Sequence, residues 1–380
     1  MLTLILKSLE NCNLRCAYCS VGDKTRGKTI SAEKMLEALR WFSAYAQQKK
    51  ENEVTVIFHG GEPMLLPPNL YRGCITTIKE EAPQLQWNFS MQSNGTLLTK
   101  EYLQMIHECD IHVGISLDGS QVLHDYYRRD SRNQPTYSRI LSNIEKLQQQ
   151  GHEVSVLMVL TKPAFHMGFE YLKELERRNL SLKINPLYSA GEAVKHPELG
   201  LHPGEYADYL IQVFHYIMQN DLALDVSPLT QWISAVINRT RPWGCSYSPQ
   251  CSETFICVDD KGDIYPCGRF CDQKLWRLGN ITEGITEEGK RRQNTLKARR
   301  NQKLPDKCKK CPICHFCYAG CTADVILYNE GNRPGILCKD YKKLAKFLYK
   351  EGIPLIRKRL NLEKEYLQEQ ERMIRKKLQN

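Results

Sequence analysis

Three cysteines stand close together near the start of the chain, in Cys12-Asn-Leu-Arg-Cys16-Ala-Tyr-Cys19. This segment follows an apolar run that has the composition of a strand. Three thiolates on one short loop can bind three irons of a 4Fe–4S cluster and leave the fourth iron open to a substrate or cosubstrate. A structural zinc site is the alternative. It requires four ligands, usually from paired CxxC or CxxH knuckles, and no histidine lies nearby.

The CxxxCx(aromatic)C spacing, with Tyr18 at the aromatic position, resembles the cluster loop of radical S-adenosylmethionine (SAM) enzymes. In that family the open iron chelates the amino and carboxylate groups of SAM. One electron then cleaves SAM to methionine and a 5′-deoxyadenosyl radical. The resemblance implies that Cys12, Cys16 and Cys19 bind the cluster and that Tyr18 lies near the adenine of SAM.

The chain has 380 residues, enough for one large and one smaller domain. Its composition, 42% hydrophobic and 25% charged, is that of a globular protein. No apolar run approaches the ~20 residues of a membrane span. The first apolar run is short and carries Lys7, so it does not resemble a signal peptide. We therefore expect a cytoplasmic protein with neither membrane nor nucleic acid as a partner. In that reducing compartment, sixteen cysteines indicate metal binding rather than disulfides.

The first 220 residues alternate short β-branched runs with helical periodicities, which predicts six βα units. The expected strands are 2–9, 54–58, 87–91, 111–117, 154–160 and 182–187, and the expected helices are 32–48 (with Ser31 as N-cap), 71–81, 100–107, 137–149, 168–178 and 203–218. Repeated βα units give a parallel sheet with right-handed crossovers. The fold class is therefore α/β. The resemblance implies a partial (β/α)6, TIM-like barrel rather than a doubly wound sheet.

Small and polar residues follow the second, third and fourth expected strands, in Gly60-Gly61-Glu62-Pro63, Ser93-Asn94-Gly95 and Ser116-Leu117-Asp118-Gly119. Each alone could be a tight turn. Together, at the carboxyl ends of successive strands, they favour one ligand site.

The resemblance gives these segments roles in SAM binding. Gly60, Gly61, Glu62 and Pro63 match the segment that binds the SAM amino group, and Ser93, Asn94, Ser116 and Asp118 match positions near the ribose and methionine. Either Arg128 or Arg129 matches a basic residue that faces the SAM carboxylate, for which a guanidinium is well shaped. We interpret His59 and His124 as structural.

The second half is rich in cysteine: eleven of the sixteen lie between Cys245 and Cys338. Seven of them, with Gly262, form a pattern that resembles the SPASM domain, a C-terminal extension of radical SAM enzymes that modify peptides and proteins. The seven are Cys251, Cys267, Cys308, Cys311, Cys317, Cys321 and Cys338.

Two fully ligated 4Fe–4S clusters need eight thiolates, and Cys257 completes that number. By resemblance, one auxiliary cluster takes Cys251, Cys257, Cys267 and Cys321, and the other takes Cys308, Cys311, Cys317 and Cys338. Cys74 and Cys109 fall in expected helices and are interpreted as ordinary buried thiols. Three further cysteines lie among the ligands in the sequence, and one of them could take the place of a ligand named above: Cys245, Cys271 and Cys314.

We expect three regions: a radical SAM barrel over 1–235, a SPASM domain over 236–345 and a helical, basic tail over 346–380. The tail is expected to break at Gly352–Pro354 and to carry an apolar stripe at Ile356, Leu360, Leu367, Ile374 and Leu378. It could dock on the barrel, bind a partner or dimerise. Since Cys12 lies too near the start for a preceding leader-binding domain, we hypothesise that the helix over 355–378 contributes to peptide recognition.

The expected cofactors are SAM and three 4Fe–4S clusters, reduced by a donor such as flavodoxin or ferredoxin. The expected reaction removes hydrogen from a residue of a ribosomally made precursor peptide and installs a C–C cyclophane or thioether cross-link, with the auxiliary clusters as the electron exit. The catalytic base is not predicted.

Two alternatives remain. Anaerobic sulfatase-maturating enzymes, which form formylglycine, share this length and the spacing of Cys251 and Cys257. In them an Asp that acts as base follows the cysteine matching Cys267, where this chain has Gly268. With the later Leu278-Gly279-Asn280-Ile281, this segment more closely resembles enzymes that mature ribosomally made peptides, and the resemblance favours cross-link formation. An iron–sulfur electron carrier or zinc-binding adaptor is an alternative of another class, and it makes no use of the residues at the strand ends.

Overall fold

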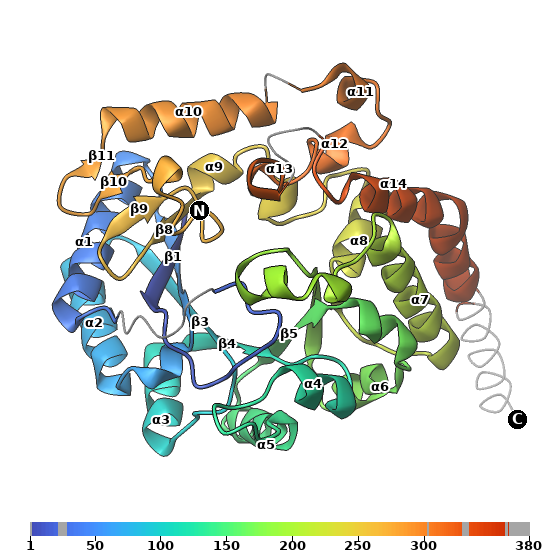
Figure 1. Cartoon of the computed structure of the whole chain (residues 1–380), viewed down its shortest axis with the longest axis horizontal. Coiled ribbons are helices and arrows are strands. Elements are labelled where there is room, and N and C mark those ends of the chain that lie inside the picture. The colour runs from blue at the N-terminus through green and yellow to red at the C-terminus, as the bar shows by residue number, and fades with distance from the viewer. Residues whose placement is uncertain (1, 22–28, 302–303, 329–333, 362–363, 365–380) are drawn as a thin grey trace, which may run out of the picture.

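A twisted parallel sheet forms the centre of the molecule, and helices cover its outer face (Figure 1). The computed structural model describes residues 2–21, 29–301, 304–328, 334–361 and 364. Within these ranges eleven strands form one sheet, in the order β11-β10-β9-β8-β1-β2-β3-β4-β5-β6-β7. The strands are β1 Leu2–Leu9, β2 Glu53–Gly60, β3 Gln86–Ser93, β4 Ile111–Ser116, β5 Val154–Leu160, β6 Ser181–Pro186, β7 Val226–Ser227, β8 Phe255–Val258, β9 Asp263–Tyr265, β10 Gly279–Asn280 and β11 Gly284–Ile285.

The helices connect successive strands in the first half and carry the cysteines in the second. They are α1 Ala32–Gln48, α2 Pro68–Glu81, α3 Lys100–Cys109, α4 Gln121–Tyr127, α5 Tyr137–Gln149, α6 Glu170–Arg177, α7 Glu205–Asn220, α8 Leu229–Asn238, α9 Cys251–Thr254, α10 Glu287–Asn301, α11 Asp306–Lys309, α12 Cys314–Cys317, α13 Thr322–Tyr328 and α14 Cys338–Phe347. No helix within the described ranges is long and apolar enough to span a membrane.

The six expected βα units are present, and the predicted α/β fold is confirmed. Strands β1 to β7 pair in parallel and in chain order. The order is open rather than closed, as a partial barrel requires. The Ser31 side chain accepts a hydrogen bond from the Lys34 N–H and caps α1 as expected.

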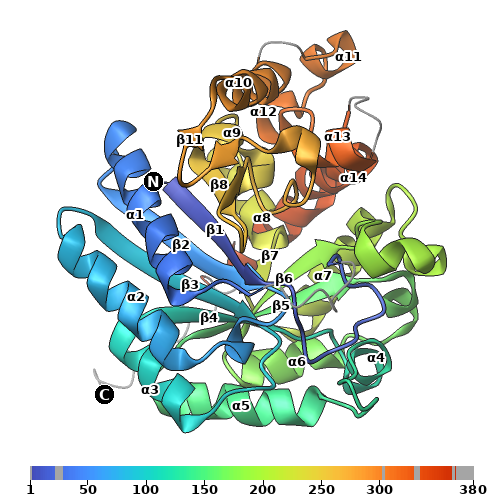
Figure 2. The same ribbon diagram turned by 60° about the vertical axis from the view of Figure 1, so that its left-hand side comes forward.

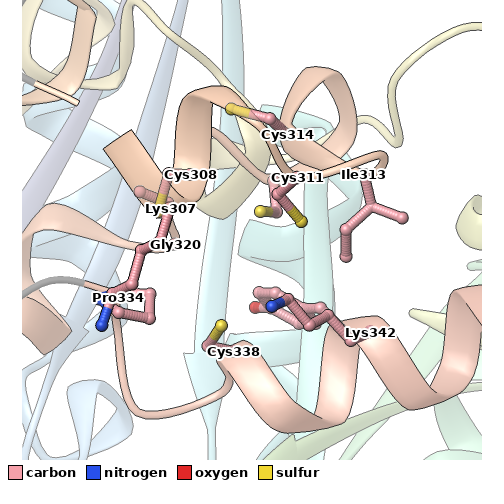
Figure 3. A pocket seen from close by; sticks show the side chains of 12 residues that line it. Lys307, Cys308, Cys311, Ile313, Cys314, Gly320, Pro334, Cys338 and Lys342 are labelled. Atoms are coloured by element: carbon pink, nitrogen blue, oxygen red, sulfur yellow. The ribbon is translucent and has the colours of Figure 1, made fainter. Parts of the chain in front are cut away.

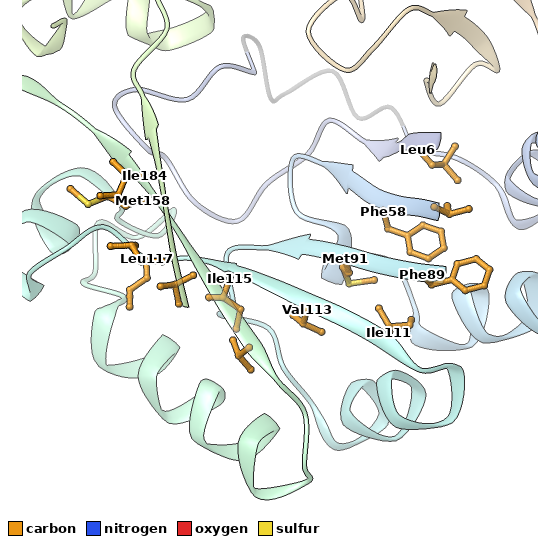
Figure 4. Packing of buried hydrophobic residues seen from close by; sticks show 14 of the residues in the cluster. Leu6, Phe58, Phe89, Met91, Ile111, Val113, Ile115, Leu117, Met158 and Ile184 are labelled. Carbon is orange, nitrogen blue, oxygen red and sulfur yellow. The ribbon is translucent and has the colours of Figure 1, made fainter. Parts of the chain in front are cut away.

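Fully buried and less buried residues alternate along the strands, so the two faces of the sheet differ in character. Leu2, Leu4 and Leu6 of β1 are almost fully buried beneath the helices. Figure 4 shows their counterparts on the neighbouring strands, including Phe58 and Phe89. The opposite face carries less buried and more polar residues. Apolar residues thus fix the sheet to its helices, while the concave face stays available for a site.

The cysteine-rich half continues the same sheet, which the sequence did not predict. Strand β8 lies beside β1 and pairs with it in parallel, with Ile5 opposite Cys257 (Figure 2). Strands β9 to β11 then add antiparallel partners. The second half is therefore joined by main-chain hydrogen bonds to the strand that leads into the first cysteine loop.

Helix α14 packs against α7. The buried Asp340 carboxylate accepts hydrogen bonds from the N–H groups of Gly204, at 3.1 Å, and Ala207, at 3.0 Å, at the start of α7. The expected break at Gly352–Pro354 is wrong, because a π-helical turn over Leu348–Gly352 leads directly into further helix at 353–361. Proline has no N–H to donate to the preceding turn of a helix. A π-helical turn is wider and can accommodate this lost hydrogen bond without ending the helix. Of the predicted apolar stripe, Leu367, Ile374 and Leu378 lie outside the described residues.

Candidate radical and auxiliary cluster sites

Segments from elsewhere in the chain fix the first cysteine loop by main-chain hydrogen bonds. The N–H groups of Arg15 and Ala17 donate to the carbonyls of Arg129 and Tyr127, at 2.8 and 3.2 Å. Cys16 is buried, whereas Cys12 and Cys19 are partly exposed. The loop therefore has a defined conformation against the end of α4 and the residues that follow it.

Gly60 and Gly61 lie directly against the segment that leads into Cys12. A Cβ on Gly60 would stand 2.1 Å from the Leu9 carbonyl oxygen, and one on Gly61 would stand 2.1 Å from that of Asn11. The N–H groups of Gly61 and Glu62 donate to the same two carbonyls, at 2.8 and 2.9 Å. A side chain at either glycine would push the cysteine loop away.

Glu62 is fully buried, and its carboxylate connects the loops after β2 and β3. It accepts hydrogen bonds from Ser93 Oγ at 2.7 Å, the Asn94 N–H at 2.7 Å and the Met64 N–H at 2.9 Å. Burial raises the pKa of Glu62, and these three hydrogen bonds oppose the rise. The carboxylate thus holds Ser93 and Asn94 in position.

Asn94 connects this network to the cysteine loop. Its Nδ2 lies 3.7 Å from the Cys12 sulfur and donates to Asn13 Oδ1 at 2.8 Å. Its Oδ1 accepts from the Thr96 hydroxyl at 2.6 Å. The sequence analysis missed Asn13 and Thr96, although their places beside Cys12 and after Asn94 could have indicated them.

Asp118 and Arg128 form a buried ion pair, with Nε 2.7 Å from Oδ2. The Arg128 guanidinium also lies 4.0 Å from the Cys16 sulfur and 5.3 Å from the Tyr18 ring centroid. Arg129 instead donates to the Asn133 carbonyl at 3.2 Å. Of the two candidate arginines, the structure brings Arg128 to the cysteine loop.

Ser116 ends β4 beside this network, and Gln92 Nε2 lies 3.4 Å from its hydroxyl. His124 accepts the Asp118 N–H at Nδ1, at 3.2 Å, and burial lowers the pKa of His124 to about 3. His59 accepts the Gly60 N–H at 2.7 Å, and burial lowers its pKa to about 4. Both rings are therefore neutral and support the main chain.

One polar group in the loop is left unsatisfied. The Tyr18 hydroxyl is buried and has no hydrogen-bond partner among the described residues. Such groups are rare in native proteins and commonly mark the place of a bound water, ion or ligand. With Arg128 beside the Tyr18 ring and Asn94 beside Cys12, the loop fits a cluster-bound, charged and hydrogen-bonding ligand.

Five cysteines line a cavity of about 230 Å³: the predicted Cys308, Cys311, Cys317 and Cys338, together with Cys314. This volume far exceeds the share of one water, about 30 Å³. The sulfur of Cys338 points toward the cysteines across the cavity, whereas that of Cys314 points away from it (Figure 3). Lys307 and Lys342 also line the cavity and can balance thiolate charge.

The thiol of Cys321 lies close enough to act on those of Cys251 and Cys267, and the thiol of Cys245 acts on both Cys251 and Cys267. Burial raises the pKa of Cys251 to about 11, with Cys321 and Cys245 adding to the rise. Burial raises the pKa of Cys267 to about 12, and the same two thiols add to that rise. The sequence analysis placed Cys257 in this set and left an exchange with Cys245 open.

Arg300 joins the two segments that carry these cysteines. Its fully buried guanidinium donates to the carbonyls of Ser246, at 2.6 Å, and Ser248, at 2.9 Å, and also to that of Gly320. The chain around Cys245 is thereby fixed to the residue before Cys321.

Cys257 lies beside a different cysteine, Cys271. It is fully buried in β8, and its thiol is within hydrogen-bond reach of Cys271. Both thiols act on Lys7 of β1: burial lowers the pKa of Lys7, but Cys271, Cys257 and Asp272 outweigh burial and raise it overall. Cys257 also lies near Cys267.

The spacing of the sulfurs bears on the zinc alternative. Four thiolates on one zinc ion, at about 2.3 Å from it, lie about 3.8 Å apart. Over the described ranges, the one group of three or more possible ligand atoms within 4.8 Å of one another is Asp259, Cys271 and Asp272. Neither cysteine set is gathered around a single ion. A cluster, in which each thiolate binds its own iron, allows a wider set.

A model of the radical SAM superfamily matches residues 6–164. The chain is 27% identical over 354 residues to a cysteine-type anaerobic sulfatase-maturating enzyme of Clostridium novyi (strain NT), covering 89% of this chain and 92% of that protein. It is 24% identical over 360 residues to a serine-type anaerobic sulfatase-maturating enzyme of Bacteroides thetaiotaomicron, covering 87% and 85%.

Solved structures share the fold. Native anSMEcpe with bound AdoMet and Cp18Cys peptide superposes with a TM-score of 0.78 at 21% identity, covering 93% of this chain and 98% of that one. Streptococcus suis SuiB bound to precursor peptide SuiA gives a TM-score of 0.63 at 16% identity, covering 86% and 73%. The chain therefore contains a radical SAM domain over residues 6–164 and is a homologue of the anaerobic sulfatase-maturating enzymes.

Proposed function

We propose that this enzyme oxidises a residue of a peptide or protein, in the manner of the anaerobic sulfatase-maturating enzymes. Its homology to both the cysteine-type and the serine-type enzymes supports that reading over a cross-link. The observation that carries the radical site is the loop of Cys12, Cys16 and Cys19, held against Asn94 and Arg128 beside an unsatisfied Tyr18 hydroxyl.

Cys12, Cys16 and Cys19 would hold a 4Fe–4S cluster, which with SAM bound would supply the electron and the radical that removes hydrogen from the substrate. The protein residues orient these partners. The Arg128 guanidinium suits a carboxylate geometrically, and its partner Asp118 limits its motion. Glu62 fixes the loop of Ser93 and Asn94, whose polar groups adjoin Cys12.

We assign two auxiliary clusters to the second half. Cys308, Cys311, Cys317 and Cys338 form one set, in agreement with the cavity that they line. For the other we assign Cys245, Cys251, Cys267 and Cys321, since Cys245 adjoins Cys251 and Cys267. Cys257, expected from the sequence, instead pairs with Cys271.

The electron donor, such as flavodoxin or ferredoxin, stays a proposal, as do the domain limits at residues 235 and 345. The helix over 355–378 that we expected to bind a peptide lies largely outside the described residues.

A cross-linking reaction is the second candidate, and Gly268 favours it. A Cβ at this position would lie 3.4 Å from Ile5 Cγ2, in ordinary contact with β1, so an aspartate could have been accommodated there. The chain lacks that carboxylate, and the nearest acid along the sequence is Asp272, in the group around Lys7. Formylglycine formation would require another base.

The experiment uses anaerobically reconstituted protein, SAM, dithionite and sulfatase-derived peptides that carry Cys or Ser at the target position. The proposal predicts 5′-deoxyadenosine and a product aldehyde that reacts with a hydrazide reagent. A product that resists the hydrazide and fails to fragment between two residues would support the cross-link instead. Turnover of neither peptide class, with SAM cleavage intact, would argue against sulfatase-type substrates.

Metal analysis tests the cofactor assignment separately. Three clusters correspond to about twelve irons, of which replacing Cys12, Cys16 and Cys19 by Ala should remove about four. A protein dominated by zinc, or an unchanged iron content in the triple variant, would contradict the assignment.

A further inference from the structure

Arg269 reaches from the loop after Cys267 to another cysteine of the first auxiliary set. Its Nη1 lies 4.0 Å from the sulfur of Cys321. It also forms an ion pair with Asp324, whose side chain is 3% exposed. A cation and an anion thus stand together beside one thiol of this set.

The barrel holds the guanidinium from its other side. The Arg269 guanidinium lies 3.8 Å from the ring centroid of Tyr188, two residues beyond the end of β6. The Tyr188 ring stacks on Tyr328, with centroids 5.7 Å apart. Burial raises the pKa of Tyr188, so the phenol stays neutral. Stacking and ion pairing together keep the charge at one place.

Both charges lie close enough to act on a cluster, and they differ in exposure: the Asp324 side chain is 3% exposed and that of Arg269 is 32% exposed. The reduction potential of a 4Fe–4S cluster depends on net charge, on hydrogen bonds to its sulfurs and on solvent exposure. Reduction adds negative charge, which a neighbouring cation stabilises and a neighbouring anion opposes. Water screens the buried Asp324 carboxylate far less than a surface charge, and it screens the partly exposed Arg269 guanidinium to an intermediate degree.

We propose that the Arg269–Asp324 pair sets the reduction potential of the first auxiliary cluster. The guanidinium raises that potential, and the carboxylate limits the rise. The pair thereby governs how readily this site accepts an electron. This inference rests on the proposed cluster at Cys245, Cys251, Cys267 and Cys321.

The test compares Arg269→Gln with Asp324→Asn in reconstituted, full-length protein. Redox titration followed by electron paramagnetic resonance gives the midpoint potentials, with Cys12, Cys16 and Cys19 replaced by Ala to remove the radical cluster signal. Arg269→Gln should move one midpoint to a more negative value, and Asp324→Asn should move the same midpoint to a more positive one. General loosening of the site would not produce shifts of opposite sign.

Arg277→Gln is the matched control. This arginine is similarly exposed, at 38%, and pairs with Asp263 at 2.7 Å; within the described residues its guanidinium interacts with Asp263 and Glu283 and with no cysteine. Its loss should leave both midpoints where they are. Arg269→Lys keeps the charge and should shift the midpoint less than Arg269→Gln does.

Iron analysis separates the two possible failures. If Cys245→Ser and Cys267→Ser retain all the iron of the parent, the proposed cluster itself is wrong. If iron is complete but the midpoints of Arg269→Gln and Asp324→Asn coincide with the parent or move together, the inference is overturned. Should Arg269→Gln lose iron, Asp324→Asn decides alone: a positive shift supports the inference and an unmoved midpoint overturns it.

Discussion

Replacing Arg128 by Met should strongly destabilise the protein. The substitution leaves the Asp118 carboxylate, whose side chain is 1% exposed, as a buried charge without its partner at 2.7 Å. Breaking a buried pair from one side costs about 3–5 kcal/mol. We expect a loss of that size in the free energy of unfolding, measured by anaerobic urea titration followed by tryptophan fluorescence.

Two further variants show whether the unpaired charge is the cause. Arg129→Met removes the neighbouring arginine, whose side chain makes no buried ion pair with the described residues, and should change the free energy of unfolding by no more than about 0.5 kcal/mol. In Arg128→Met with Asp118→Asn, no buried charge remains and the amide oxygen can still accept the Val159 N–H, 3.0 Å away in the parent. This double variant should recover most of the free energy of unfolding that Arg128→Met loses. A double variant as unstable as Arg128→Met would refute the reasoning and assign the loss to packing against Tyr18.

Three other outcomes are expected. Cys245→Ser should lower the iron content of reconstituted protein while Cys257→Ser keeps that of the parent, and equal losses would contradict the assigned set. Because burial lowers the pKa of His124 to about 3 from 6.5, the unfolded chain binds an extra proton between these values. The free energy of unfolding should therefore fall as pH drops below about 6.5, by about 1.4 kcal/mol per pH unit from this residue. Urea titrations should show a shallower dependence in His124→Asn than in the parent, whereas parallel curves would exclude the effect. In Glu62→Gln the new amide NH₂ would face the Ser93 hydroxyl and the Asn94 N–H, which are themselves donors. The free energy of unfolding should fall by about 1–3 kcal/mol. An unchanged urea midpoint would contradict this expectation.

The sequence predicted the βα units well because their signals are local. The expected strand at 154–160 coincides with β5, and Ser31 caps α1 as its type suggests. By contrast, β8 to β11 are strands of two to four residues whose pairing depends on distant partners. No periodicity over so few residues distinguishes them from turns.

The auxiliary ligands show a different limit. The spacing of five intervening residues occurs twice, between Cys245 and Cys251 and between Cys251 and Cys257. Spacing alone could not choose between these pairs. The choice follows from the pairing of β8 with β1 and from the bonds of Arg300, both of which join segments far apart in the chain. Arg128 and Arg129 were equally ambiguous until the end of α4 oriented them.

The pairing of β1 with β8 also affects how the protein is made. About 250 residues separate Thr3 from its partner Phe255. At about 5–20 residues per second, a ribosome needs roughly 12–50 s to deliver the second strand after the first. During that interval one edge of β1 has no partner and is open to wrong pairing. We therefore expect nascent chains that end before residue 255 to be more prone to aggregate and to bind chaperones than chains that extend past β8.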